Sequence, residues 1–169
     1  MMYCRWLESP IGDLLLASDG QSLTGLYLKG QKHFPTITPD WQASLEAAPF
    51  SQVTWQLSEY FNNQRQSFDL PLSPIGTDFQ KQVWQHLCDI PFGETISYGT
   101  LAKTLGQPNA SRAVGAANGR NPISIIVPCH RVVTADGKLT GYAGGVERKQ
   151  WLLQHEKTTN QLDLLNALE

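Results

Sequence analysis

Three side chains in the second half of this 169-residue chain could together perform nucleophilic chemistry. Cys129 and His130 are adjacent, within Pro128-Cys129-His130-Arg131-Val132, and Glu156 follows later in the chain. A cysteine attacks as the thiolate, and an imidazole that is oriented by a carboxylate can remove the thiol proton. Because the same groups serve as nucleophile, base and orienting acid in catalytic triads, the sequence predicts an activated cysteine at position 129.

The surroundings of each cysteine decide how it is interpreted, because a free cysteine is more often a small buried apolar residue than a nucleophile. Cys88 falls within an apolar helical pattern and is interpreted as such a buried residue. Cys129 instead follows a proline, which fixes the chain, and precedes a histidine and an arginine. We expect a lowered pKa for the Cys129 thiol, because a nearby imidazole favours the thiolate.

The position of His130 raises a geometric question. Neighbouring side chains of an extended chain point to opposite sides, so a direct bond to Cys129 requires a bend at the Pro128–Cys129 peptide. Proton transfer through a water molecule is the other possibility, and it is the one we favour. His130 could otherwise be an ordinary surface histidine.

Glu156 is predicted to lie in the last turn of a helix over residues 146–156. A carboxylate there opposes the helix dipole and needs a compensating group. His130 and Lys157 are both candidates for that group. The tail beyond Glu156 is either a short amphipathic helix or disordered.

Two short helices joined by a turn are predicted ahead of Cys129, over residues 97–105 and 112–118. Ser97 is the expected cap of the first helix, and Asn109 or Ser111 is the expected cap of the second. Such a pair fits a DNA groove, and the recognition helix of a helix-turn-helix contacts DNA mainly through its N-terminal residues.

Tyr98 and Arg112 open these two helices and are the candidate DNA-contacting residues, although a helix-surface arginine is the commoner case. Net charge over the whole chain is −2, but residues 97–150 hold seven basic and two acidic side chains, against four and seven in residues 1–75. A basic face confined to the half with the helix pair is typical of a modest DNA binder, while ordinary surface charge is the alternative.

The segments on either side of Cys129 hold two further candidates. Asn121 either forms a simple turn with Pro122 or braces the backbone that leads to Cys129. Residues 123–127 are predicted to be a short extended apolar run. Tyr142, in the glycine-rich segment 141–145, either walls a pocket for a planar ligand or belongs to a linker.

The first half of the chain is expected to be an α/β unit. Strand patterns flank the turn signal Asp19-Gly20, and apolar residues recur at helical spacing from Val53 to Phe61. Prolines and a glycine near residue 76 mark a boundary, so we predict domains at 1–75 and 76–169. The other expected elements are strands over 3–7 and within 12–28, a long connection over 30–50, and a helix with a Thr77–Gln80 capping box.

Composition restricts the class of protein. Hydrophobic residues make up 41% of the chain, enough for a packed core. Neither a membrane-spanning run nor a signal peptide is expected, which favours the cytoplasm. Three sparse cysteines predict reduced thiols rather than a disulfide framework or a metal site, and neither metal nor cofactor is expected.

The motif Pro128-Cys129-His130-Arg131-Val132 resembles the O6-alkylguanine-DNA alkyltransferases, also called methylated-DNA–protein-cysteine methyltransferases. The resemblance covers roughly residues 77–156 and includes Arg112-Ala113-Val114-Gly115, Asn121-Pro122, Gly93 to Tyr98 and Tyr142 to Gly145. It implies a stand-alone bacterial-type member with an N-terminal ribonuclease H-like α/β domain and a C-terminal helical domain with a helix-turn-helix. Many members have serine where this chain has Ala143, which bears on substrate preference.

The resemblance also implies a role for each candidate. Cys129 accepts an alkyl group from O6 of guanine, or O4 of thymine, in double-stranded DNA, once per protein molecule. His130, through a water, and Glu156 activate it, and Asn121 braces the turn. Tyr98 aids extrusion of the base, Arg112 fills the gap in the duplex, and Tyr142 lines the base pocket. A monomer without membrane association is expected.

Two other functions explain part of the pattern. A helix-turn-helix regulator accounts for the helix pair and the basic face, but not for Cys129 beside His130. A cysteine hydrolase accounts for Cys129, His130 and Glu156, but not for Arg112 or the basic face, and it would turn over repeatedly.

Overall fold

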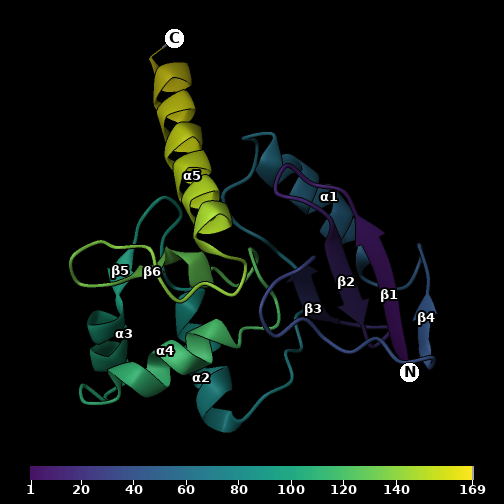
Figure 1. The fold of residues 1–169 in the computed structure, drawn as a ribbon. Helices are drawn as coiled ribbons and strands as arrows, with labels where there is room; N and C mark the ends of the chain where they lie inside the picture. The colour runs from purple at the N-terminus through teal and green to yellow at the C-terminus, as the bar shows by residue number, and fades with distance from the viewer. Residues whose placement is uncertain (169) are drawn as a thin grey trace.

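The N-terminal half is built around a four-stranded sheet, in a computed structural model that describes residues 1–168 (Figure 1). The strands are β1 (Met2–Leu7), β2 (Leu14–Ser18), β3 (Leu23–Leu28) and β4 (Trp41–Ala43), in the order β3-β2-β1-β4. β2 and β3 form the antiparallel hairpin that the turn signal predicts, and β1 pairs antiparallel with β2. β4 pairs parallel with β1 inside the segment 30–50, where the sequence predicts only a connection.

Helix α1 (Phe50–Phe61) packs on this sheet through one buried face. Its apolar residues Phe50, Val53, Leu57 and Tyr60 recur at helical spacing, as the sequence predicts. The outer edge of β3 pairs with the other half of the chain: Leu26 N–H donates to Pro122 O (2.9 Å), and Ser124 N–H donates to Leu26 O (3.0 Å). The approach to Cys129 is therefore attached to the N-terminal sheet.

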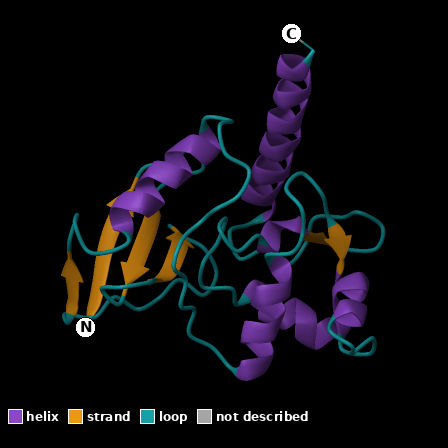
Figure 2. Cartoon of the chain, turned by 180° about the vertical axis from the view of Figure 1, so that it is seen from behind, coloured by secondary structure: helices purple, strands orange, loops and turns teal. Residues whose placement is uncertain are grey.

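The C-terminal half is mostly helical (Figure 2). Thr77 and Gln80 form the predicted capping box of α2, and the Ser97 hydroxyl caps α3 by accepting from Thr100 N–H. The elements are α2 (Asp78–Leu87), β5 (Ile96–Ser97), α3 (Tyr98–Thr104), α4 (Ser111–Gly119), the 3-10 turn η1 (Cys129–Arg131), β6 (Val132–Val133) and α5 (Val146–Ala167).

Three local predictions in this half are wrong. Helix α4 begins after Ala110, and neither Asn109 nor Ser111 caps it. Cys88 is exposed, because α2 ends at Leu87 and Cys88 lies beyond its buried face. Residues 123–127 form a turn with Ile125 at φ 72°, because Val127 N–H bonds back to Ile123 O.

Helix α5 is longer than the sequence predicts, and it extends away from the rest of the molecule (Figures 1 and 2). Glu156 therefore lies in mid-helix and not in the last turn as predicted, so it does not oppose the dipole at a helix end. The buried positions on α5 are Lys149, Leu152, Glu156 and Thr159. The tail is helical to Ala167, and four leucines at its end are exposed: Leu162, Leu164, Leu165 and Leu168.

A single apolar core joins the two halves. It includes Leu26 and Tyr60 from the first half and Val83, Val127 and Leu152 from the second. Within residues 1–168, no helix combines the length and apolar character needed to cross a membrane. The boundary between domains near residue 75 stays a prediction.

Candidate active site

Cys129 begins the 3-10 turn η1, and its side chain is only 3% exposed. Its N–H donates to Val127 O (2.8 Å), and its carbonyl accepts from Asn118 Nδ2 (3.3 Å). Burial raises the pKa of the Cys129 thiol to about 11, while the Asn121 amide and the Lys149 charge act in the opposite direction. The expectation of a lowered pKa is therefore wrong for this structure, because loss of water outweighs the polar neighbours.

The Asn121 side chain holds the turn that precedes Cys129. Nδ2 donates to Val127 O (2.8 Å) and to Ile123 O (3.3 Å), and Oδ1 accepts from Ile123 N–H (3.0 Å). Asn121 is buried, so these bonds also satisfy polar groups that water does not reach. The structure thus places the Asn121 amide where a brace for the backbone is expected.

His130 and Glu156 meet in the protein interior. The distance from His130 Nε2 to Glu156 Oε2 is 2.7 Å, and neither side chain is exposed. Because a carboxylate accepts at Nε2, this nitrogen carries the proton, and Nδ1 is left with a lone pair. Nδ1 is buried and has no hydrogen-bond partner among the described residues. Burial lowers the pKa of His130 despite the opposing effect of Glu156, so a neutral imidazole is favoured.

Glu156 accepts hydrogen bonds from four residues. Besides His130, Arg131 donates through Nε (2.8 Å) and Nη2 (3.2 Å), the Tyr60 hydroxyl donates at 2.8 Å, and Gly93 N–H donates at 3.3 Å. Burial alone would raise the pKa of Glu156, but the hydrogen bonds from His130 and Arg131 and the charge of Arg131 hold it well below its ordinary value. Glu156 is therefore a fixed anion that orients the imidazole.

Three residues of this site were missed because their sequence patterns have ordinary explanations. Tyr60 fits the apolar face of α1, and Arg131 and Lys149 count as surface charges of the basic half. Arg131 is instead 6% exposed and bound to Glu156, and Lys149 is fully buried. The spacing of Lys149 from Glu156, two helical turns along one face of α5, was the available signal.

Lys149 connects the active-site turn to the glycine-rich segment. Its ammonium donates to Val132 O (2.5 Å), directly after η1, and to Thr140 O (3.0 Å). Burial lowers the pKa of Lys149 to about 8, and the Cys129 thiolate acts in the opposite direction. A cation is thus held near the sulfur by backbone carbonyls alone among the described residues.

Tyr98 and Tyr142 lie near Cys129. The pKa of each phenol is raised, first by burial and then by the charge of a Cys129 thiolate. The Tyr98 hydroxyl donates to Thr140 O (3.0 Å), the same carbonyl that Lys149 holds. The Tyr142 hydroxyl is buried with no partner among the described residues.

A cavity of about 530 Å³ opens between α4 and the glycine-rich segment. This volume is within the range of small-molecule pockets, about 300–1,000 Å³. Tyr142 is one of its walls, but Cys129 is not. Its lining residues are Lys32, His33, Gly115, Ala116, Gly119, Arg120, Gly141, Tyr142 and Ala143.

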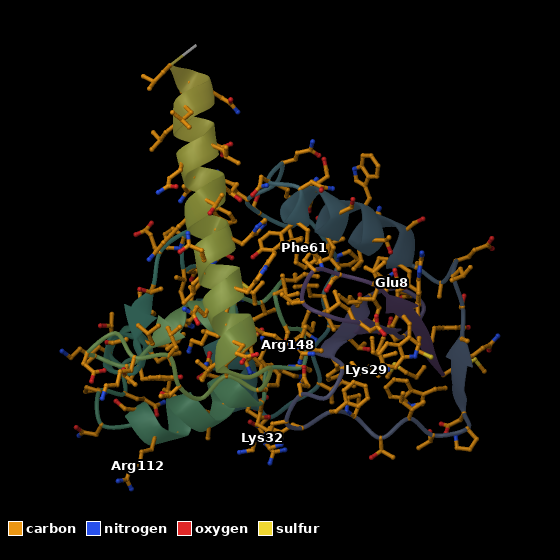
Figure 3. The ribbon with its side chains drawn as sticks, turned by 45° about the horizontal axis from the view of Figure 1, so that its top comes forward. Glu8, Lys29, Lys32, Phe61, Arg112 and Arg148 are labelled. Atoms are coloured by element: carbon orange, nitrogen blue, oxygen red, sulfur yellow. The ribbon has the colours of Figure 1, made fainter. Side chains whose placement is uncertain are left out.

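Arg112 lies at the start of α4, and its side chain points away from the body of the molecule (Figure 3). Not all of the positive charge of this half is on the surface, because Arg131 and Lys149 are buried. The exposed basic residues of segment 97–150 are Lys103, Arg112, Arg120 and Lys138. The basic face is therefore smaller than the sequence count suggests, and it includes the helix pair.

The chain matches two family models that together span nearly all of it. Residues 2–74 match the ribonuclease-like domain of 6-O-methylguanine DNA methyltransferase, and residues 78–158 match the DNA-binding domain of the same family. The methylated-DNA–protein-cysteine methyltransferase of Methanosarcina barkeri is 51% identical over 92% of this chain and 98% of its own. The Mycobacterium tuberculosis protein of that name is 49% identical over 97% of this chain and 98% of its own.

A solved structure has the same architecture. The crystal structure of Mycobacterium tuberculosis OGT in complex with DNA superposes with a TM-score of 0.85, at 49% identity, over 93% of this chain and 94% of that chain. The two-domain arrangement expected from the sequence, a ribonuclease-like α/β domain followed by a helical DNA-binding domain, is confirmed.

Proposed function

Because this chain belongs to the 6-O-methylguanine DNA methyltransferase family, and so repairs DNA directly by moving an alkyl group onto one of its own cysteines, we propose that Cys129 is the acceptor. Cys4 and Cys88, the other two cysteines, have no histidine–carboxylate pair beside them among the described contacts. The observation that supports Cys129 most strongly is the neighbouring imidazole. His130 is held at Nε2 by Glu156 and keeps a free lone pair on a buried Nδ1.

Because its pKa is high, the Cys129 thiol needs a general base, and His130 is that base. With a pKa of about 11, Cys129 is almost entirely protonated at neutral pH, so its proton must leave as the substrate reacts. His130 Nδ1 takes this proton through one bridging water molecule. Glu156 stabilises the resulting imidazolium, and Lys149 favours the negative sulfur through its charge.

The transfer step is a displacement at the alkyl carbon. The sulfur forms a bond to this carbon as the bond from carbon to O6 of guanine breaks, and the electron pair stays on the purine. The purine takes up one proton and becomes ordinary guanine. The thiol proton that His130 accepted balances this proton when His130 releases it through water. A thioether has no easy leaving group, so each protein molecule acts once.

The reaction requires the damaged base outside the helix, since the alkyl carbon is not accessible in a stacked duplex. Arg112 enters the gap that the base leaves, and Tyr142 lines the pocket that receives it. In the free protein the Tyr98 hydroxyl donates to Thr140 O, so it must exchange this partner to donate to the purine. Phosphate contacts by exposed cations make binding sensitive to salt.

The substrate is double-stranded DNA that carries O6-alkylguanine, with O4-alkylthymine as a second substrate. The protein acts as a monomer in the cytoplasm, where reducing conditions keep an acceptor thiol free. These assignments rest on family membership and on the chemistry of the site.

The test is label transfer from a duplex that contains O6-[³H-methyl]guanine. We expect one equivalent of label per protein and then no further reaction. Cys129→Ala should transfer none but still bind the duplex, and Cys88→Ala, the matched control, should behave as the unaltered protein does. Transfer by Cys129→Ala would contradict the assignment, as would repeated turnover, which indicates a hydrolase. DNA binding without transfer indicates a regulator.

A further inference from the structure

The N-terminal half contributes a hydroxyl group to the buried pair of His130 and Glu156. Tyr60, on α1, donates from its hydroxyl to Glu156 Oε2 at 2.8 Å across 96 positions of sequence. Tyr60 is 1% exposed and Glu156 is not exposed, so water does not compete for this bond. Oε2 is also the oxygen that accepts from His130 Nε2, at 2.7 Å.

Tyr60 is fixed by its surroundings as well as by this bond. Its ring packs against Phe61, Phe68 and His155, with centroid distances of 5.2, 5.6 and 5.1 Å. Its backbone carbonyl is 2.7 Å from His155 Nε2 on α5. Burial, followed by the charge of Glu156, raises the pKa of Tyr60 well above its ordinary value, so the phenol remains a donor.

We propose that Tyr60 is a positioning residue of the alkyl-transfer site, whose hydroxyl fixes Glu156 Oε2 and limits how strongly this oxygen stabilises a protonated His130. Each donor to a carboxylate lowers its affinity for a further proton. A carboxylate with fewer donors holds an imidazolium more strongly. Tyr60 thus keeps His130 neutral at the start of the reaction, when its lone pair must accept the thiol proton. The inference rests on the relay proposed above.

Other charged and titratable side chains also surround the pair of His130 and Glu156. Arg131 on η1 donates twice to Glu156, and Lys149 on α5 acts on His130 through its charge. Cys129 directly precedes His130. The charge of Glu156 contributes to the raised pKa of Tyr142. Besides the base His130 itself, Tyr60 is the neutral donor side chain among the described contacts of Glu156, so it can be altered without changing net charge.

Tyr60→Phe removes the hydroxyl and keeps the ring in its aromatic cluster. Glu156 then stabilises the imidazolium more strongly, and the pKa of His130 rises. Because a protonated His130 cannot accept the thiol proton, the acid limb of the transfer rate should move to higher pH by about half a unit to one unit. Tyr27→Phe is the matched control: it lies on β3, and its hydroxyl makes no hydrogen bond to a carboxylate among the described contacts.

The experiment measures single-turnover label transfer by the full chain across the acid limb, with circular dichroism to confirm folding. An upward shift in Tyr60→Phe, with no shift in Tyr27→Phe, supports the inference. If the unaltered protein labels Cys129 and folded Tyr60→Phe keeps the same acid limb, the inference is overturned while the proposed function stands. If the unaltered protein labels no cysteine, the proposed function fails instead.

A second variant keeps the test decisive where phenylalanine disturbs folding. Incorporation of 3-fluorotyrosine at position 60 keeps the hydroxyl and nearly the same shape, but makes the phenol a stronger donor. The acid limb should then move to lower pH, opposite to the shift in Tyr60→Phe. An upward shift or no shift with fluorotyrosine contradicts the inference.

Discussion

Burial keeps the Cys129 thiol protonated and out of reach of small alkylating agents. An exposed thiolate reacts with any alkylating agent, whereas a buried protonated thiol needs a base and a fitting substrate at the same time. His130 is the proposed base, and the thiol itself stays neutral because burial raises the pKa of Cys129 to about 11. On this account the site is selective because proton transfer and base insertion must coincide.

Replacing Glu156 tests the role of the buried anion. Glu156→Gln leaves Arg131, 6% exposed, without its counter-charge, and we expect a loss of about 3–5 kcal/mol in the free energy of unfolding. The matched control is Glu59→Gln, since Glu59 pairs with Arg65 at 2.9 Å near the surface, where a loss of about 0–1 kcal/mol is typical. Urea unfolding of both variants measures the difference, and equal losses would contradict the account.

The pH dependence of stability follows from the same carboxylate. The folded-state pKa of Glu156 lies below its ordinary value of 4.5, so its stabilisation is fully present above that pH and is lost as the pH falls below it. Glu156→Gln should therefore lose less stability than the unaltered protein on acidification through this range. Urea midpoints at several acid pH values would show it, and parallel losses in the two proteins would count against the assignment.

At the scale of elements, the helix pair places Arg112 on the surface, while α5 carries the buried Lys149 and Glu156. Arg112→Ala should slow transfer from duplex DNA about tenfold or more, because an extruded base leaves an unfilled gap that costs a few kcal/mol. Transfer from the free base O6-methylguanine should be unchanged. Lys138→Ala, an exposed cation beside Asp136, is the control. Equal slowing on duplex and free base would remove the extrusion role of Arg112.

Local elements were predictable where their signals are local. The Thr77 capping box, the Ser97 cap and the β2–β3 hairpin follow from residues within a few positions of one another. The turn at Ile125 and the length of α5 did not follow. The turn closes through the bond from Val127 N–H to Ile123 O, and its segment is held by backbone pairing with Leu26 on β3, a distant contact that no local pattern encodes.

Part of the site was also predictable from the sequence. Cys129 and His130 are marked by adjacency, and the pairing of Glu156 with His130 was one of two expected alternatives. Tyr60 and Lys149 were not recognised, because an aromatic residue on an apolar stripe and a lysine on a helix usually have structural or solvated roles. Tyr60 reaches Glu156 through packing between the halves of the chain, whereas Lys149 reaches Val132 and Thr140 within the second half.

For the whole molecule, the shared core implies that the two halves unfold together. Leu26 is hydrogen-bonded to Pro122, and Arg148 donates to Ile11 O (3.0 Å) and Lys29 O (2.7 Å), so contacts between halves are both apolar and polar. We expect one cooperative transition, with amides of β2 and α5 exchanging with solvent at a common urea midpoint. Persistence of α5 protection after β2 has exchanged would contradict this.

The most direct test of the account is mass spectrometry of the cysteine-containing peptides after the protein meets a duplex with one O6-methylguanine. The account predicts that the peptide with Cys129 gains one methyl group in place of the thiol hydrogen, in a one-to-one ratio with repaired guanine, while Cys4 and Cys88 stay unmodified. A methyl group on either of the other cysteines, or repaired guanine with an unmodified Cys129, would contradict it.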